Sequence, residues 1–299
     1  MEPTAILTGD IHLRSDTPVC RTDDFNAAQW MKIMWLADLQ RKYGCLIIDS
    51  GDLSDSWKLT PWAEVQAIRL MPREFYTIPG NHDLPNHNLS MLDKSSLAVL
   101  MAAGIVNCCL KPRDFDNFTL YPFPWGSKLE PCVAERNKRI KRVAVCHTMT
   151  YQGKSPWPGC KDLDAETLLD KMEGYDLVLT GHNHKPFVVK KDGRLLVNPG
   201  SLMRMDASQI DYEPCVWLWF AETNEVEPVY APIEKNVISR EHLDKKRDKD
   251  KRLEAYVEKL DGDYDISRKF GDNLEAFFSK NEIPVAVRDI VNECTEEVI

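Results

Sequence analysis

Five short hydrophobic runs are spread along the chain, at residues 5–8, 45–48, 75–78, 143–146 and 177–179. Each run is apolar and partly β-branched or aromatic, as strands covered on both faces are. Residues 25–43, 61–69 and 90–103 instead carry apolar positions at helical spacing, and Gly44 and Gly104 follow the first and the last of these segments. The alternation of strands and helices predicts an α/β fold.

A different pattern follows between residues 186 and 232, where short apolar segments come in close succession. They lie at residues 187–190, 195–198, 216–220 and 226–229, and Lys191-Asp192-Gly193 is a typical hairpin turn between the first two. We expect these strands to form a mixed sheet that closes against the sheet of the first runs. The predicted architecture is a four-layer α/β/β/α sandwich of two mixed sheets.

The composition changes again near Glu234. Charges of both signs alternate densely over residues 240–254, and apolar residues then recur at helical spacing through Phe278 and Ile290. This pattern predicts a large domain over residues 1–234 and a short helical C-terminal tail over residues 235–299. The alternative is that the tail only packs on the domain before it.

Composition narrows the class of protein. The chain has 299 residues, 43% hydrophobic and 28% charged, without a run of about 18 apolar residues or a secretory signal, so no membrane association is expected. The nine scattered cysteines form no CxxC pair, which favours reduced thiols and a cytoplasmic location. A net charge of −9 ordinarily argues against a general nucleic-acid binder, although bound cations would offset it.

Each of the five apolar runs is followed by side chains that bind metals well. In chain order these are Asp10 and His12, Asp52, Asn81, His147, and finally His182 and His184. Groups beyond the carboxyl ends of the strands of an open α/β sheet lie close together, so these side chains are expected to converge. They exceed the roughly four ligands of a structural zinc and suit two divalent ions, which the carboxylate of Asp52 can bridge.

The expected chemistry is hydrolysis of a phosphoester. Asp10 and His12, with one of the late histidines, are expected to hold one ion, while Asn81, His147 and the other late histidine hold the second. A hydroxide that bridges ions roughly 3.5–4 Å apart would attack phosphorus. Each motif taken alone could instead be only a turn or a helix cap.

His82 is the candidate general acid. Its side chain should diverge from that of its neighbour Asn81, because adjacent side chains at a turn point apart, and it should therefore reach the phosphate or the leaving group. We expect Asp83 to accept a hydrogen bond from the other ring nitrogen of His82, which would favour the imidazolium. His82 and Asp83 are thus the predicted catalytic pair.

With these residues the chain resembles the calcineurin-like metallophosphoesterase superfamily, whose blocks run D-x-H, G-D, G-N-H-D/E, H and G-H-x-H. All five blocks occur within roughly residues 5–205. The resemblance implies the metallophosphoesterase fold for the catalytic domain and His82 as the catalytic histidine. It also implies one metal site made of Asp10, His12, Asp52 and His184, and a second made of Asp52, Asn81, His147 and His182.

Within the superfamily, Gly9-Asp10-Ile11-His12-Leu13 and the segment at residues 51–56 look most like the SbcD-type DNA repair exonucleases and their phage relatives. That resemblance implies a manganese-dependent DNA exonuclease or endonuclease. It also implies an SMC-like ATPase partner of the SbcC type, which the C-terminal tail could contact, and a homodimer is a further candidate assembly. Imidazole ligands leave zinc, iron and nickel open as alternatives to manganese, and oxygen ligands leave magnesium open.

Four further residues are candidates for substrate binding. Trp57 follows Asp52, and Tyr151 and Trp157 lie among lysines after His147, an arrangement that suits stacked bases and neutralised phosphates. The alternative is that the tryptophans only pack their loops. Arg204 could clamp a phosphate or form a surface ion pair.

The sequence therefore predicts a metal-dependent phosphodiesterase that acts on nucleic acid. A second hypothesis is a small-substrate phosphoesterase that cleaves cyclic nucleotides or phosphomonoesters. A third is a partner-binding module whose metal site is vestigial. The complete set of ligands argues against the third hypothesis. The shape of the cleft should separate the first two, because a long groove past Trp57 and Trp157 would favour DNA and a closed pocket would favour a nucleotide.

Overall fold

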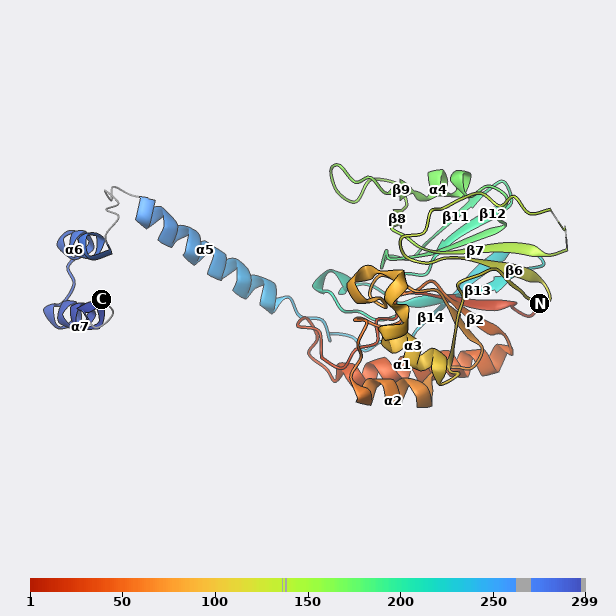
Figure 1. The fold of residues 1–299 in the computed structure, drawn as a ribbon, viewed down its shortest axis with the longest axis horizontal. Helices are drawn as coiled ribbons and strands as arrows, with labels where there is room; N and C mark the ends of the chain where they lie inside the picture. The colour runs from red at the N-terminus through yellow and green to blue at the C-terminus, as the bar shows by residue number, and fades with distance from the viewer. Residues whose placement is uncertain (136, 138, 262–269, 297–299) are drawn as a thin grey trace. The chain divides into compact units, whose positions relative to one another are not determined.

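The computed structural model describes residues 1–135, 137, 139–261 and 270–296. The contacts between residues divide the chain into two compact units, Met1–Ser239 and Arg240–Ile299. The first unit contains both sheets, and the second is helical in its described part (Figure 1).

The first sheet has six strands in the order β14-β13-β1-β2-β3-β4. Strands β1 to β4 pair parallel with one another, whereas β13 pairs antiparallel with β1 and β14 pairs antiparallel with β13. The sheet is therefore mixed. Its strands are β1 (Ala5–Thr8), β2 (Leu46–Asp49), β3 (Phe75–Thr77), β4 (Val106–Cys108), β13 (Cys215–Phe220) and β14 (Glu225–Tyr230).

The second sheet also has six strands, in the order β11-β12-β10-β7-β6-β5. Its four central strands are parallel, and β11 and β5 pair antiparallel at the two edges. Its strands are β5 (Arg113–Asp114), β6 (Phe118–Phe123), β7 (Lys141–His147), β10 (Leu177–Gly181), β11 (Phe187–Lys191) and β12 (Arg194–Asn198). A separate pair, β8 (Thr150–Tyr151) and β9 (Leu163–Asp164), lies outside both sheets.

Alternate residues of the strands build the layers. Leu7 of β1 and Val145 of β7 belong to one buried cluster, which fills the space between the two sheets. The preceding residue of β1, Ile6, belongs to a second cluster with the helices on the outer face of the first sheet. Cys146 of β7 belongs to a third cluster on the outer face of the second sheet. The predicted four-layer α/β/β/α sandwich is confirmed.

Three helices cover the first sheet and one covers the second (Figure 1). The three are α1 (Phe25–Tyr43), α2 (Pro61–Leu70) and α3 (Ser96–Ala102), and the fourth is α4 (Ala165–Lys171). Short 3-10 turns lie at Pro85–His87, Leu89–Lys94 and Ala207–Gln209. The helical tail, which was predicted, contains α5 (Glu241–Asp261), α6 (Phe270–Lys280) and α7 (Val285–Glu296).

Two details of the predicted fold are wrong. The helix expected over residues 90–103 is broken, because Ser95 is extended (φ −103°, ψ 161°) and its hydroxyl caps α3 by accepting a hydrogen bond from the nitrogen of Ala98. The four late strands do not share one sheet. Strands β11 and β12 extend the second sheet, while β13 and β14 complete the first, because β13 pairs with β1.

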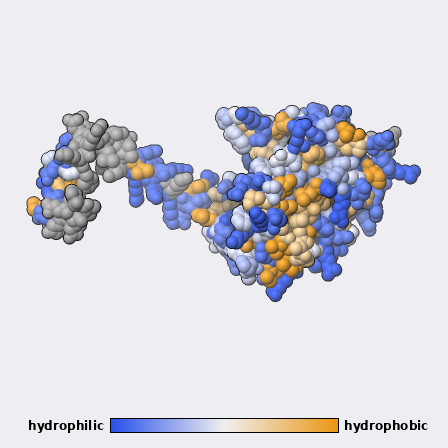
Figure 2. All heavy atoms as spheres, in the orientation of Figure 1, coloured by the Kyte–Doolittle hydropathy of each residue, from blue (hydrophilic) through white to orange (hydrophobic). Residues whose placement is uncertain are grey.

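The surface of the first unit carries exposed apolar side chains on α2, among them Trp62, Val65 and Ile68. Figure 2 shows hydrophobic residues gathered on the part of the visible face where Figure 1 places α2 and α3. None of the helices that the structure describes combines the length and the apolar composition needed to cross a membrane.

Candidate metal centre

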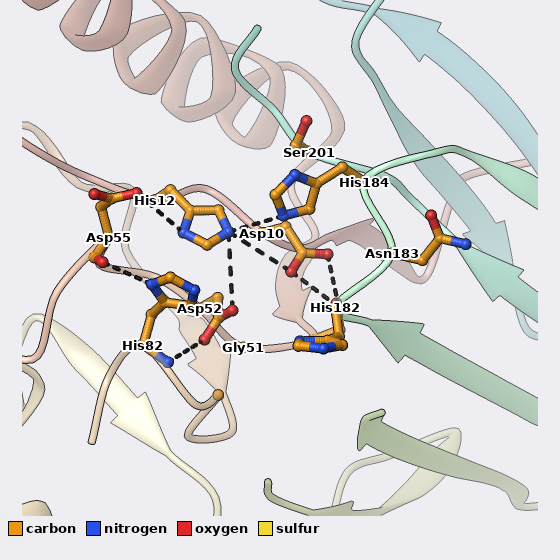
Figure 3. Close-up of polar contacts among 12 residues, drawn as sticks. Asp10, His12, Gly51, Asp52, Asp55, His82, His182, Asn183, His184 and Ser201 are labelled. Carbon is orange, nitrogen blue, oxygen red and sulfur yellow. Dashed lines mark hydrogen bonds and ion pairs between the residues drawn. The ribbon is translucent and has the colours of Figure 1, made fainter. Parts of the chain in front are cut away.

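The carboxyl ends of β1, β2 and β3 lie at one edge of the first sheet and those of β7 and β10 at one edge of the second, because these strands run parallel within each sheet. The two edges meet, since Nδ1 of His147 at the end of β7 is 2.8 Å from the backbone oxygen of Ser50 after β2. The structure brings together there all seven predicted ligands. Figure 3 shows side chains from the ends of β1, β2 and β10 pointing toward a common centre, with His82 beside them. Those seven are Asp10, His12, Asp52, Asn81, His147, His182 and His184.

The first group of ligand atoms comes from Asp10, His12 and His184, and these atoms lie within 4.8 Å of one another. Nε2 of His12 is 3.1 Å from Nε2 of His184 and 4.0 Å from Oδ1 of Asp10. The two imidazoles thus present ring nitrogens to each other, which is the arrangement of two ligands that share one cation. Asp10 also accepts hydrogen bonds from the backbone nitrogen of His182 at 2.9 and 3.0 Å.

The second group of ligand atoms comes from Asp52, His147 and His182, and these atoms also lie within 4.8 Å of one another. Nε2 of His147 is 3.2 Å from Oδ2 of Asp52 and 3.1 Å from Oδ1 of Asn81. The same Oδ2 of Asp52 is 3.8 Å from Nε2 of His12, so this carboxylate lies between the two groups. Asp52 is therefore placed as a bridging ligand would be.

The backbone at this centre is strained. Asp10, His12, Asp52 and His182 have φ values of 48°, 51°, 54° and 75°, in the left-handed region that non-glycine residues seldom occupy. Such conformations cost of the order of 1–3 kcal/mol each and persist only where the surroundings enforce them. Backbone hydrogen bonds between the loops after β1 and β2 hold Asp10, His12 and Asp52, including one from the nitrogen of Asp10 to the oxygen of Gly51 at 3.0 Å. His182, after β10, is held by the hydrogen bond from its nitrogen to the carboxylate of Asp10 at 2.9 Å.

Two glycines allow the loops to approach the ligands. A Cβ on Gly80 would lie 2.1 Å from Oδ1 of Asp52, and a Cβ on Gly51 would lie 2.7 Å from Nδ1 of His147. Neither position has room for a side chain, so the G-D and G-N-H motifs require glycine for steric reasons.

Burial keeps most of the imidazoles neutral. Desolvation lowers the pKa of His182 to about 4, and lowers the pKa values of His12 and His184 below their ordinary range. A neutral imidazole has a free electron pair, which is the form that binds a cation. His147 differs: burial alone would lower its pKa, but the neighbouring Asp52 raises it to about 9.

The carboxylates complete the charge pattern. Burial raises the pKa of Asp10 to about 7, because the nearby His147 offsets the desolvation only in part. Burial also acts to raise the pKa of Asp52, but His147 outweighs it and holds that pKa below the usual range. The raised pKa of Asp10 shows that the surrounding side chains supply too little positive charge to keep its buried carboxylate ionised, and a bound cation would supply it. These residues fit two divalent cations, with Asp52 common to both.

His82 lies beside the first group, with its ring centroid 4.8 Å from that of His12. Its Nδ1 atom is 2.7 Å from the backbone oxygen of Asp55, so Nδ1 donates to that carbonyl. Its backbone nitrogen donates to Oδ1 of Asp52 at 2.8 Å. The predicted hydrogen bond between His82 and Asp83 is therefore wrong, because a carbonyl occupies the position that was assigned to the carboxylate.

Asp83 has a different role. It is fully buried and accepts hydrogen bonds from the backbone nitrogens of Gly80 at 2.9 Å and Ser54 at 2.9 Å, and from the Ser54 hydroxyl at 2.8 Å. It thus joins the loop after β2 to the loop after β3. Asp83 is a positioning residue rather than a group that touches the reacting atoms.

The four residues predicted to bind substrate differ in their exposure and in what surrounds them. Arg204 is buried and donates to the backbone oxygens of Ile210 and Glu234, so it is available neither to a phosphate nor to a surface ion pair. Trp57 is 39% exposed, and Tyr151 is partly buried in β8. Trp157 is 49% exposed and lines a cavity that reaches His147 and His182.

Two cavities open on the centre, one beside each group of ligands. The first has a volume of about 640 Å³, and its lining includes His12, His82 and His184 together with Arg14 and Lys185. The second has a volume of about 390 Å³ and reaches His147 and His182. Trp57 lines neither of these two cavities, so they do not form a continuous groove past both Trp57 and Trp157.

Sequence reasoning missed two residues of the centre. Oδ1 of Asp55 is 3.6 Å from Nδ1 of His12, and Oδ2 is 3.3 Å from the Arg14 guanidinium. Trp125 places its ring 5.0 Å from that of His182. A signal for each exists in the chain, since Asp55 follows Asp52 by three residues and Trp125 lies in a Pro-Trp-Gly turn directly after β6.

The chain is similar to known proteins over most of its length. A family model described as "Calcineurin-like phosphoesterase superfamily domain" matches residues 6–214. An archaeal phosphodiesterase of known structure is 14% identical, with a TM-score of 0.42 over 76% of this chain and 98% of that chain. A 5'-nucleotidase precursor from Thermus thermophilus is 13% identical, with a TM-score of 0.43 over 87% of this chain and 59% of that chain.

Proposed function

The chain belongs to the calcineurin-like phosphoesterase superfamily and is a phosphoester hydrolase, and from this premise we propose that it cleaves phosphodiester bonds in nucleic acid. More specifically, we propose a manganese-dependent DNA nuclease similar to the SbcD type. The observation that carries the choice of a diester is the presence of two cavities, one beside each group of ligands.

The shape of the substrate distinguishes a phosphodiester from a phosphomonoester at this centre. A phosphodiester carries an organic group on each side of phosphorus, whereas a monoester carries one. The two cavities share no lining residue, and each reaches a different pair of the predicted ligands. A phosphate bound at the centre could therefore send one substituent into each cavity, which a monoesterase would not need.

The residues of the chain have distinct tasks in this reaction. Two bound divalent ions would neutralise the oxygens on phosphorus and lower the pKa of a nearby water. Because Nδ1 of His82 donates to the backbone oxygen of Asp55, Nε2 is the ring atom that can give a proton to the leaving oxygen. Asp83 holds the loop that carries His82 through its bond to Gly80.

The test is an assay of the purified protein with Mn²⁺ on single-stranded DNA, duplex DNA, cyclic nucleotides and a model diester. We expect cleavage of DNA and of the model diester, and loss of activity after chelation that added Mn²⁺ restores. Degradation of cyclic nucleotides alone would refute the nuclease proposal. Restoration by zinc, iron, nickel or magnesium but not by manganese would refute the choice of metal.

A small-substrate phosphoesterase is the second candidate. One observation in its favour is the size of the cavities, about 390 and 640 Å³, which lies within the range of about 300–1,000 Å³ typical of small-molecule sites. A second is that these two cavities form no continuous groove past Trp57 and Trp157, the shape expected for DNA. The same assay separates the candidates, since only a nuclease should accept an oligonucleotide. Failure to bind any divalent ion would instead favour a module with a vestigial metal site.

We also propose that the tail contacts a protein partner, of which an SMC-like ATPase is the candidate that the SbcD resemblance suggests. Several of its apolar side chains are exposed, among them Phe277, Val285 and Ile290. Deleting residues 241–299 should leave hydrolysis of the model diester intact. Loss of folding on deletion would show that the tail is required by the catalytic unit instead.

A second copy of this chain is a further proposed partner. The exposed apolar residues Val65 and Ile68 on α2 support it. Light scattering should then report twice the monomer mass of 34.3 kDa. Charged substitutions at both Val65 and Ile68 should lower the measured mass to that of the monomer. A monomer mass for the unchanged protein would refute the homodimer.

A further inference from the structure

The cavity beside the second group of ligands has an unusual lining. Besides His147 and His182 its lining includes two large aromatic side chains, Trp125 and Trp157. The only formally charged side chain other than histidine in this lining is Asp162, an acid. Neither lysine nor arginine contributes, so the cavity is poorly suited to a second phosphate and better suited to an uncharged planar group.

Trp125 is held in place at the centre itself. Its backbone nitrogen donates to the oxygen of Pro79 at 3.0 Å, one residue before the Gly80-Asn81 turn. Its ring lies 5.0 Å from that of His182 at an interplanar angle of 39°, and 6.1 Å from that of His147. An aromatic group stacked on Trp125 would thus lie next to two predicted metal ligands, His147 and His182.

Trp157 provides a second aromatic surface in the same cavity. It lies in the segment between β8 and β9, and its side chain is 49% exposed. A large apolar ring that remains half-exposed beside a cavity offers area that a ligand can cover. Serine and threonine hydroxyls at Ser127 and Thr148 can meet the polar edge of such a ligand.

We propose that this cavity binds one unpaired nucleobase of the substrate, stacked on Trp125 and Trp157, while the adjacent phosphate lies at the metal centre. The proposal rests on the proposed cleavage of nucleic acid and specifies its substrate further. A base in a duplex is stacked and paired, so the subsite selects single-stranded DNA or unpaired ends. Trp125 and Trp157 are then specificity-determining residues for the nucleotide beside the scissile bond.

The binding test uses two probes that differ only by the base, deoxyadenosine 5′-monophosphate and 2-deoxyribose 5-phosphate. Titration followed by tryptophan fluorescence should show quenching by the nucleotide. Trp157→Ala, which removes a stacking contact, should weaken binding of the nucleotide by about 5- to 150-fold. Trp125→Phe, which keeps a smaller aromatic face, should weaken it less, and both variants should bind the sugar phosphate as the unchanged protein does. Equal weakening of both probes, or of neither, would overturn the subsite.

Hydrolysis provides an independent measurement. We compare a single-stranded trinucleotide with the same molecule lacking the base next to the scissile bond. In the Mn²⁺-loaded protein Trp157→Ala should raise KM for the intact trinucleotide and not for the abasic one, with metal content unchanged. Trp62→Ala is the matched control, since Trp62 is also 49% exposed and does not line this cavity.

The two proposals fail in different ways. If the unchanged protein cleaves neither trinucleotide nor any other diester, the nuclease proposal is wrong, and the binding titration still reports whether a base is recognised. If both trinucleotides are cleaved with the same KM by all variants, the nuclease proposal stands and the base subsite is refuted.

Discussion

Gly80 lies against the carboxylate that is placed between the two groups of ligands, so the substitution Gly80→Ala tests the geometry of the centre directly. A Cβ built at Gly80 would lie 2.1 Å from Oδ1 of Asp52 and 2.4 Å from its backbone nitrogen. Real Cβ atoms essentially never come closer than 3.0 Å, so the carboxylate must retreat by 0.9 Å (3.0 minus 2.1). Rotation of the side chain alone cannot relieve the contact with the backbone.

The size of the effect follows from this displacement. A shift of about 1 Å in a catalytic constellation costs on the order of 100-fold in rate. The hydrogen bond from the backbone nitrogen of His82 to Oδ1 of Asp52, 2.8 Å long, would also be disturbed. We therefore expect kcat/KM for a model diester to fall about 100-fold or more, with fewer than two Mn²⁺ ions bound per chain.

The assay combines steady-state kinetics, metal analysis and thermal unfolding. Gly104→Ala is the control, because a Cβ there meets nothing within 4 Å and only the φ of +70° is unfavourable. That control should lose about 1 kcal/mol of stability and keep its metal content and rate. Wild-type kinetics and metal content in Gly80→Ala would refute the proposed position of Asp52.

Three further predictions follow from single side chains. His82→Ala should lower kcat by about 10²- to 10⁴-fold while both ions stay bound; loss of an ion would show that His82 is a ligand. Asp83→Asn should lower the melting temperature as well as the rate, because the amide cannot accept all the hydrogen bonds from Ser54 and Gly80; a change in rate alone would return Asp83 to a catalytic role. Lys32 is buried, and desolvation lowers its pKa from 10.5 to about 7. The folded state therefore disfavours the charged form of Lys32. This penalty is complete below pH 7 and becomes smaller as the pH rises toward 10.5. Lys32→Met should therefore raise the unfolding free energy, relative to wild type, by more at pH 6 than at pH 10. An equal difference in unfolding free energy at the two pH values would contradict this.

Much of the fold could be predicted from local pattern. The strand at residues 5–8 and the helix at residues 25–43 agree with β1 and α1 to the residue. Apolar runs of β-branched residues and helical spacing of apolar positions are local signals, so they can be recognised without knowing the partners. The break at Ser95 was missed because helical spacing continues across it, and only the extended backbone and cap reveal it.

The membership of strands in sheets could not be predicted in this way. The segments at residues 216–220 and 226–229 have the same local pattern as those at residues 187–190 and 195–198. Their separation into two sheets depends on the pairing of β13 with β1, more than 200 residues apart in the chain. Hydrogen bonds between distant strands leave no trace in the periodicity of either strand.

The sequence by itself determined which metal-binding side chains follow each of the five strands, because apolar runs and the residue types after them are local signals. The meeting of strand ends from two sheets at one centre depends on how the sheets pack across the buried cluster between them. Only the tertiary structure decided how the remaining groups are used. Asp83 accepts hydrogen bonds from the backbone of two loops and not from His82. Arg204 is buried and donates to backbone carbonyls, and the ring of Trp125 lies next to that of His182. The reason is physical: the type of each element and the residues at its end are local in the sequence, whereas the partner of a hydrogen bond or a ring depends on how sheets and loops from distant segments pack.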